Sequence, residues 1–112
     1  MSRRDDALSL RHMRDHAVEA AELVRGRARA ELDADRVLAL ALTKLVEIIG
    51  EAAGRVSEPT RDAAPGLPWR QIVGTRNRLV HGYDEIDLDV LWEIATVELM
   101  PLVEQLDRML AG

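Results

Sequence analysis

Apolar residues recur at helical spacing along nearly the whole of this 112-residue chain, and no segment alternates apolar and polar residues with a period of two. The densest pattern comprises Leu38, Ala41, Leu42, Leu45, Ile48, Ile49, Ala52, Ala53 and Val56, with Val37, Leu40 and Val46 beside them. These residues cover more than one face of the predicted helix. Such a helix is typically buried on two sides, against its own bundle and against a second subunit. We therefore expect an all-α fold without strands that forms a homodimer.

The same periodicity predicts an up-down bundle of four main helices and a single domain over residues 1–112. The helices are expected at about residues 4–29, 35–56, 69–81 and 87–109. A carboxylate at a helix start accepts hydrogen bonds from free backbone N–H groups. Either Asp33 or Asp35 therefore suits the cap of the second helix, and Asp87 suits the cap of the fourth.

Prolines and glycines mark the breaks between these helices. Residues 57–68 form the longest predicted loop. Pro68 suits the first residue of the third helix, and Gly82 suits its C-terminal cap. Pro101 falls inside the fourth helix and should kink or restart it, because proline removes a backbone hydrogen bond and clashes with the preceding turn.

Composition limits the classes of protein to which the chain can belong. Apolar residues make up 47% of it, which excludes disorder, and no apolar run approaches the roughly 18 residues needed to cross a bilayer. The charged segment 1–6 does not resemble a secretion signal. There is no cysteine, so disulfides and thiolate chemistry are excluded. We expect a cytoplasmic protein with no membrane association and no cofactor.

The distribution of charge is uneven. The chain has 20 acidic and 15 basic residues, so it lacks the basic surface of a general nucleic-acid binder. Between residues 84 and 107 there are eight acids and no lysine or arginine. Arg70, Arg76 and Arg78 lie immediately before this acidic stretch. A small basic pocket in an acidic body suits an enzyme that acts at one site.

Residues 76–83 combine the side chains needed to cut RNA without a metal. Arg76, His81 and Tyr83 form an R-x4-H-x-Y pattern. A guanidinium binds a phosphate diester, an imidazole transfers protons near neutral pH, and a phenol donates or accepts a hydrogen bond. The expected reaction is transesterification, in which a 2′-hydroxyl attacks phosphorus and leaves a 2′,3′-cyclic phosphate.

Each residue of the motif has a predicted part in this reaction. His81 is the candidate general acid or base, and Arg76 would stabilise charge on the phosphoryl oxygens. Asn77 would orient His81 or the sugar, and Tyr83 would contact phosphate or hydroxyl. On one continuous helix Asn77 and His81 share a face, but Arg76 lies about 140° from His81. We therefore expect two subunits to build a composite site at their interface.

The same residues also have purely structural interpretations. His81 could cap helix carbonyls, Tyr83 could be a half-buried packing residue, and Asn77 could bond a neighbouring backbone group. Arg76 or Arg78 could pair with carboxylates of the second helix. The two candidate partners are Glu47 and Glu51.

Three further features are weaker candidates for function. His12 and His16 stand four residues apart, a spacing able to hold a metal, but no third ligand is evident and we predict no metal site. Trp69 and Trp92 are expected to be core or interface anchors. Trp69 also lies near enough to the motif in sequence to stack on a base.

Together these residues resemble the HEPN superfamily and, within it, the HepT-like toxins of bacterial toxin–antitoxin pairs. The similarity includes the R-x4-H-x-Y core with Asn77 after the arginine. It extends to flanking blocks at residues 48–53, 68–74 and 87–92, in the same order and spacing. The resemblance covers about residues 5–110, which is almost the whole chain.

The resemblance implies a helical bundle that dimerises into a metal-independent ribonuclease of a type VII toxin–antitoxin system. It places Arg76 and His81 at the catalytic positions, Asn77 at the polar supporting position and Tyr83 at the motif tyrosine. Arg78 is grouped with the supporting or RNA-binding residues. The implied partner is a minimal, MntA-like nucleotidyltransferase antitoxin that transfers AMP from ATP to Tyr83.

Two other functions remain open on the sequence. The chain could be a non-enzymatic dimeric docking module for the nucleotidyltransferase, which its acidic balance would suit. It could instead be a nucleotide-binding accessory domain in which Arg76 and Arg78 hold a phosphate without cleavage. His81 distinguishes these functions, because only the ribonuclease requires its imidazole.

Overall fold

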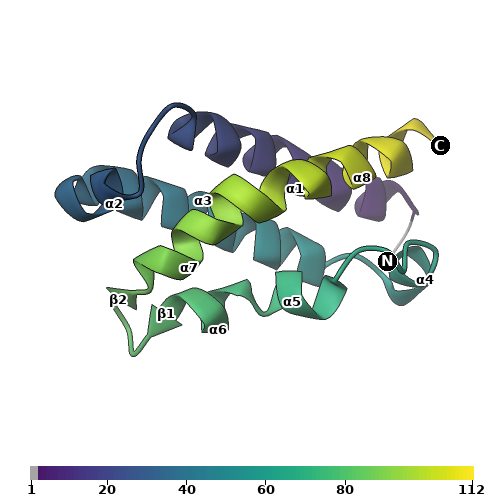
Figure 1. Ribbon diagram of the computed structural model, residues 1–112. Helices are drawn as coiled ribbons and strands as arrows, with labels where there is room; N and C mark the ends of the chain where they lie inside the picture. Colours follow the sequence, from purple (N-terminus) through teal and green to yellow (C-terminus); the bar gives the residue numbers. More distant parts are fainter. Residues whose placement is uncertain (1–2) are drawn as a thin grey trace.

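The computed structural model describes residues 3–112 as a bundle of helical rods (Figure 1). The long rods are α1 (Arg3–Val24), α3 (Arg36–Gly54) and a continuous run of α7 (Leu88–Glu93), the π-helix η1 (Ile94–Glu98) and α8 (Leu99–Ala111). The short elements are α2 (Ala30–Ala34), α4 (Glu58–Asp62), α5 (Trp69–Val73), α6 (Thr75–Leu79), β1 (Val80–His81) and β2 (Glu85–Ile86). The predicted all-α class is confirmed. The expectation of no strands is wrong, because β1 and β2 form an antiparallel hairpin.

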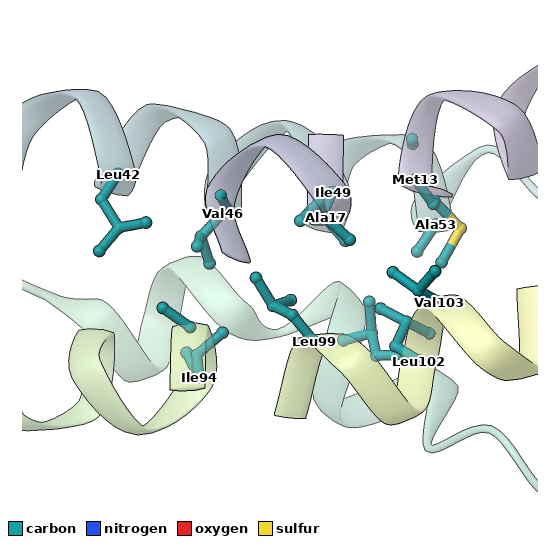
Figure 2. Close-up of a cluster of buried hydrophobic side chains, with 14 of the residues drawn as sticks. Met13, Ala17, Leu42, Val46, Ile49, Ala53, Ile94, Leu99, Leu102 and Val103 are labelled. Atoms are coloured by element: carbon teal, nitrogen blue, oxygen red, sulfur yellow. The ribbon is translucent and has the colours of Figure 1, made fainter. Parts of the chain in front are cut away.

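The core lies where the long rods meet, since α1 packs against both α3 and α8. Figure 2 shows side chains from these rods pointing toward one another. Met13 and Leu42 are fully buried, and Leu99 is 2% exposed. The labelled residues of this cluster are Met13, Ala17, Leu42, Val46, Ile49, Ala53, Ile94, Leu99, Leu102 and Val103. Within residues 3–112, no helix is both long and apolar enough to cross a membrane.

The most apolar helix, α3, is buried on one side and partly bare on the other. Leu42 and Val46 lie in the core, whereas Val37 is 77% exposed and Leu40 is 44% exposed. The predicted burial against the bundle is therefore confirmed. The second subunit stays a prediction, and the exposed apolar residues are the surface that it would cover.

Two of the predicted capping residues are confirmed. Asp35, and not Asp33, caps α3 by accepting a hydrogen bond from the backbone N–H of Leu38 at 3.0 Å. Asp87 caps α7 by accepting one from the N–H of Val90 at 3.1 Å. Each cap satisfies an N–H group that has no partner within its own helix.

The first two predicted helices end earlier than expected. Helix α1 ends at Val24, five residues short, and a turn with Gly26 at φ 73° leads into the unpredicted α2. Helix α3 ends at Gly54, two residues short. The predicted loop 57–68 contains the short helix α4.

The predicted third helix is not continuous. It breaks at Gly74 into α5 and α6, and α6 ends at Leu79 because Val80 is extended, at φ −113° and ψ 123°. Pro68 precedes α5 and is not its first helical residue. A Cβ at Gly50 would lie 3.0 Å from the carbonyl oxygen of Ile72, so this glycine lets α5 approach α3 closely.

The predicted interruption near Pro101 takes the form of a π-helix. Residues Ile94–Glu98 adopt this wider turn immediately before α8, whose first turn contains Pro101. Proline cannot donate to the carbonyl four residues earlier, which belongs to Val97. The π-helix ends at Glu98, three residues before the proline, and α8 continues through Pro101 to Ala111.

The carboxylate of Asp6 fastens α4 to α1. It is 4% exposed and accepts hydrogen bonds from the Ser57 hydroxyl, from the Ser57 N–H at 3.0 Å and from the Thr60 hydroxyl at 2.6 Å. The hydrogen bond from the Ser57 hydroxyl, followed by that from Thr60, lowers the pKa of Asp6 below its ordinary value of 3.8. A buried carboxylate is tolerated here because donors surround it.

Replacing Asp6 with asparagine should lower the free energy of unfolding at neutral pH by about 2 kcal/mol, because charge-assisted hydrogen bonds are lost. The deficit should be constant above pH ~5 and shrink as the pH falls below 3.8, because the carboxyl of the unfolded wild type takes up a proton there while the folded one, whose pKa is lower, still resists it. Urea unfolding of Asp6→Asn at several pH values measures this, with the exposed Glu58→Gln as control. A deficit that does not change with pH would show that packing, and not charge, makes Asp6 important.

Candidate active site

The motif is divided between a helix and a hairpin. Arg76, Asn77 and Arg78 lie on α6, His81 lies on β1, and Tyr83 lies in the turn that follows. The hairpin and α4 lie at opposite ends of the molecule (Figure 1). The expected helical geometry, with Asn77 and His81 on one face and Arg76 about 140° away, is therefore wrong. The chain leaves the helical path after Leu79, so helical angles do not relate Arg76 to His81.

Arg76 is the most open of the ion-paired motif residues. Its side chain is 69% exposed, and its Nε lies 3.7 Å from Glu47 Oε2 on α3. This contact confirms Glu47 as its carboxylate neighbour. A long, solvated contact of this kind contributes little to stability. A phosphate oxygen could replace the carboxylate at low energetic cost.

Arg78 is held much more firmly. Its Nη1 and Nη2 donate to the two oxygens of Glu98, at 3.1 and 2.8 Å. The two side chains are 29% and 30% exposed. The hydrogen bonds to Glu98 raise the pKa of the Arg78 guanidinium. The expected pairing of Arg78 with Glu47 or Glu51 is wrong, because its partner comes from η1.

His81 is accessible and faces an acid. Its side chain is 62% exposed, and Nε2 lies 3.8 Å from Asp87 Oδ2. The other oxygen of Asp87 caps α7, which fixes this carboxylate beside the imidazole. Opposite His81 in the hairpin lies Glu85. The interpretation of His81 as a helix cap is wrong, because α6 has already ended.

Tyr83 projects from the hairpin. It is 90% exposed, so its interpretation as a half-buried packing residue is wrong. Asn77 is also exposed, and its side chain takes part in none of the hydrogen bonds found among the described residues. Gly82 at φ 73° makes the turn between His81 and Tyr83. Both motif positions beyond α6 are thus presented to solvent.

A groove of about 350 Å³ adjoins Arg76 between α3 and the α5–α6 junction. It is lined by Glu47, Gly50, Glu51, Gly54, Val73 and Arg76. An exposed guanidinium at the edge of a groove can bind a phosphate, and an exposed imidazole can exchange protons with a bound hydroxyl.

The weaker candidates have structural roles. Trp69 is 9% exposed and donates from Nε1 to the carbonyl of Ala64 at 3.0 Å, so it anchors the core and does not stack on a base. Trp92 is half-buried against the core. The Nδ1 of His16 lies 2.7 Å from the carbonyl oxygen of His12. No group of three potential metal ligands occurs within the described part of the chain.

Sequence reasoning overlooked Glu98 and saw Asp87 only as a cap. Near Glu98, the sequence feature used was Pro101, three residues later. It predicted an interruption of the helix but not the direction in which the Glu98 side chain would point. The site therefore combines an R-x4-H-x-Y motif with carboxylates from three other elements, α3, η1 and the start of α7.

This combination defines a candidate phosphodiester-cleaving site on a helical bundle. The chain matches the HepT-like ribonuclease family over residues 13–109 and belongs to that family. The expected family and the expected enzyme class, ribonuclease, are confirmed at this level.

Several curated proteins are similar over most of their length. "Putative RNase MJ1380" of Methanocaldococcus jannaschii is 29% identical over 96% of this chain and 98% of its own. "Putative RNase TTE0752" of Caldanaerobacter subterraneus subsp. tengcongensis is 30% identical over 90% of each. "Probable ribonuclease HepT" of Thermococcus cleftensis is 28% identical over 67% of this chain and 68% of its own. No solved structure matches significantly.

The hairpin turn should be sensitive to the loss of glycine. Gly82→Ala should lower the free energy of unfolding by about 1–2 kcal/mol, because a Cβ is strained at positive φ. A Cβ there would meet nothing within 4 Å, so the cost is purely conformational. Gly26→Ala is the matched control, with the same φ of 73° and equally open space, in the turn between α1 and α2. Equal losses in urea unfolding are expected, and a much larger loss at Gly82 would mean that the hairpin has contacts beyond its backbone.

Proposed function

We propose that this chain is a metal-independent endoribonuclease toxin of a type VII toxin–antitoxin pair, acting in the cytoplasm as a single HepT-like domain. The observation that carries the proposal is that the side chains of Arg76 and His81 are both accessible in a member of the HepT-like ribonuclease family. Arg76 is bound only loosely by Glu47, and His81 is open to solvent. Both can therefore engage a phosphodiester without unfolding any element.

The proposed reaction uses groups of the chain alone. His81 takes the proton of the 2′-hydroxyl as that oxygen attacks phosphorus, or protonates the departing 5′-oxygen. Arg76 binds the phosphoryl oxygens and stabilises their developing charge. The bond to the 5′-oxygen breaks, and a 2′,3′-cyclic phosphate remains. Asn77 and Tyr83 contact the sugar and phosphate, and Arg78 supports α6 through Glu98.

The proposed active form is a homodimer with a composite site. Val37 and Leu40 support it, because exposed apolar side chains on α3 gain from burial against a second copy. The family resemblance supports the pairing of two motifs across one seam. A second subunit would also enclose a site that is shallow in one chain.

Tyr83 supports regulation by a nucleotidyltransferase antitoxin of the MntA-like kind. At 90% exposure its phenol can enter the active site of another enzyme. The oxygen of Tyr83 attacks the α-phosphorus of ATP, AMP is transferred and pyrophosphate leaves. The added phosphate brings negative charge and bulk to the place where RNA phosphate would bind.

A second candidate function is the non-enzymatic docking module. The net charge of −5 and the high exposure of Tyr83 favour recognition by a protein over recognition by RNA. In this function Tyr83 is the acceptor of AMP, and the imidazole of His81 is dispensable.

Cleavage of RNA in EDTA tests the ribonuclease. Wild-type protein should release fragments with 2′,3′-cyclic phosphate ends, and His81→Ala and Arg76→Ala should each cut about 10²–10⁴-fold more slowly. His16→Ala and Arg36→Ala are matched controls on other helices and should retain activity. Equal inactivity of wild type and variants, with the intact mass confirming unmodified protein, would favour the docking module.

Modification of Tyr83 can be tested by mass, since the chain has one tyrosine. A cognate nucleotidyltransferase with ATP should add the mass of one adenylate to the wild type and abolish its RNA cleavage. Tyr83→Phe keeps the ring without the acceptor oxygen, so its mass should not change and it should escape inhibition. A mass increase on Tyr83→Phe would place the modification on another residue.

A further inference from the structure

Within residues 3–112, Glu98 makes the shorter of the two ion pairs that the motif helix α6 forms with other elements. Its two oxygens accept hydrogen bonds from Arg78 at 3.1 and 2.8 Å, the two-pronged geometry that guanidinium and carboxylate share. The side chain of Gln71, on α5, also lies 3.5 Å from Glu98. By comparison, the surface pair of Arg29 and Asp89 is 32% and 86% exposed. The Arg78–Glu98 pair is more shielded and is screened less by solvent.

The motif helix has few other means of holding its place. Helix α6 has five residues, far fewer than the roughly 12–15 that an isolated helix needs for stability. Its packing rests on two buried residues, Thr75 at 5% and Leu79 at 0% exposure. These anchor its ends, and the guanidinium of Arg78 ties its side to η1.

The π-helix explains how Glu98 reaches this position. Glu98 is the last residue of η1, and α8 begins at the next residue. A π-turn holds one more residue than an α-turn and changes the direction of the side chains that follow it. Apolar residues under this rod, Ile94 and Leu99, are buried at 3% and 2% exposure. The core thus fixes the backbone from which Glu98 extends.

We propose that Glu98 is a positioning residue for the reaction, acting through Arg78 to fix α6 and thereby Arg76 and the start of the hairpin. The inference rests on the proposed ribonuclease activity. It also assigns Arg78 to support and removes it from the RNA-contacting side chains, because its charge is already paired with Glu98 through two of its five N–H donors.

The two possible roles of Arg78 give opposite outcomes for the same variant. If Glu98 positions α6, Glu98→Ala should reduce kcat about 10- to 100-fold with KM for RNA near the wild-type value, because small displacements of catalytic groups are costly. If Glu98 merely withholds an RNA-binding arginine, Glu98→Ala should bind RNA more tightly. Its salt dependence would then steepen by about 0.7 per phosphate gained.

Kinetics on a defined RNA should also include Glu98→Gln, Arg78→Ala and the double variant of Glu98 and Arg78. Glu98→Gln retains one acceptor oxygen and should fall between wild type and Glu98→Ala. Arg78→Ala should match Glu98→Ala, and the double variant should be little worse than either, since each acts through the other. Asp89→Ala removes a carboxylate from the unrelated pair with Arg29 and should keep wild-type kcat. Additive losses in the double variant would overturn the inference.

Hydrogen exchange gives a readout that requires no RNA. The backbone N–H groups of Asn77 and Arg78 donate to the carbonyl of Gly74, at 3.0 and 3.3 Å. These two N–H groups should exchange faster in Glu98→Ala than in the wild type. In Asp89→Ala they should exchange at the wild-type rate. Unchanged exchange overturns the inference, whatever the wild type does to RNA. Faster exchange in a protein that never cuts RNA overturns the proposed function, while Glu98 still positions α6.

Discussion

The site depends on the burial of a five-residue helix. Leu79 ends α6 with its side chain fully buried, and burial of a leucine contributes about 1.5–3 kcal/mol. The carbonyl of Leu79 accepts a hydrogen bond from the N–H of Asp87 at 2.7 Å, which closes the base of the hairpin. One residue therefore anchors the helix that carries Arg76 and fixes the strand that carries His81. The same closure brings Asp87 close to the imidazole.

The three ion pairs of the motif differ in length and in exposure to solvent. Each of the motif's three basic side chains faces a carboxylate from another element, at N···O distances of 2.8 Å for Arg78, 3.7 Å for Arg76 and 3.8 Å for His81. The short contact is shielded and the longer ones are solvated, so solvent and salt weaken the latter first. In the proposed reaction, an incoming phosphate would therefore displace the carboxylate of Arg76 more readily than that of Arg78. The carboxylates around the motif thus hold Arg78 in place and leave Arg76 and His81 accessible.

The sequence predicted the long rods well and the motif's local path poorly. Periodicity and caps located α1, α3 and the α7–η1–α8 rod because these depend on repeated local signals, including Asp35, Asp87 and Pro101. The break at Gly74 and the hairpin depend on tertiary contacts: α5 approaches α3 at Gly50, and Val80 pairs with Ile86. Residue types predicted the chemistry of Arg76, His81 and Tyr83, and their roles stay a prediction. Glu98 escaped notice because its role requires a π-turn and a partner 20 residues away.

The hairpin also changes the grounds for a composite site. On a continuous helix, about 140° would separate Arg76 from His81, and that angle alone would demand a second subunit. Because His81 lies on β1 and not on the helix, that angle does not describe the chain and cannot by itself require a second subunit. The case for pairing then rests on α3, where Val37 and Leu40 remain exposed, and on the family resemblance. A dimer formed there would bury this apolar surface, and in the proposed function it would also build the composite site from two copies of the motif.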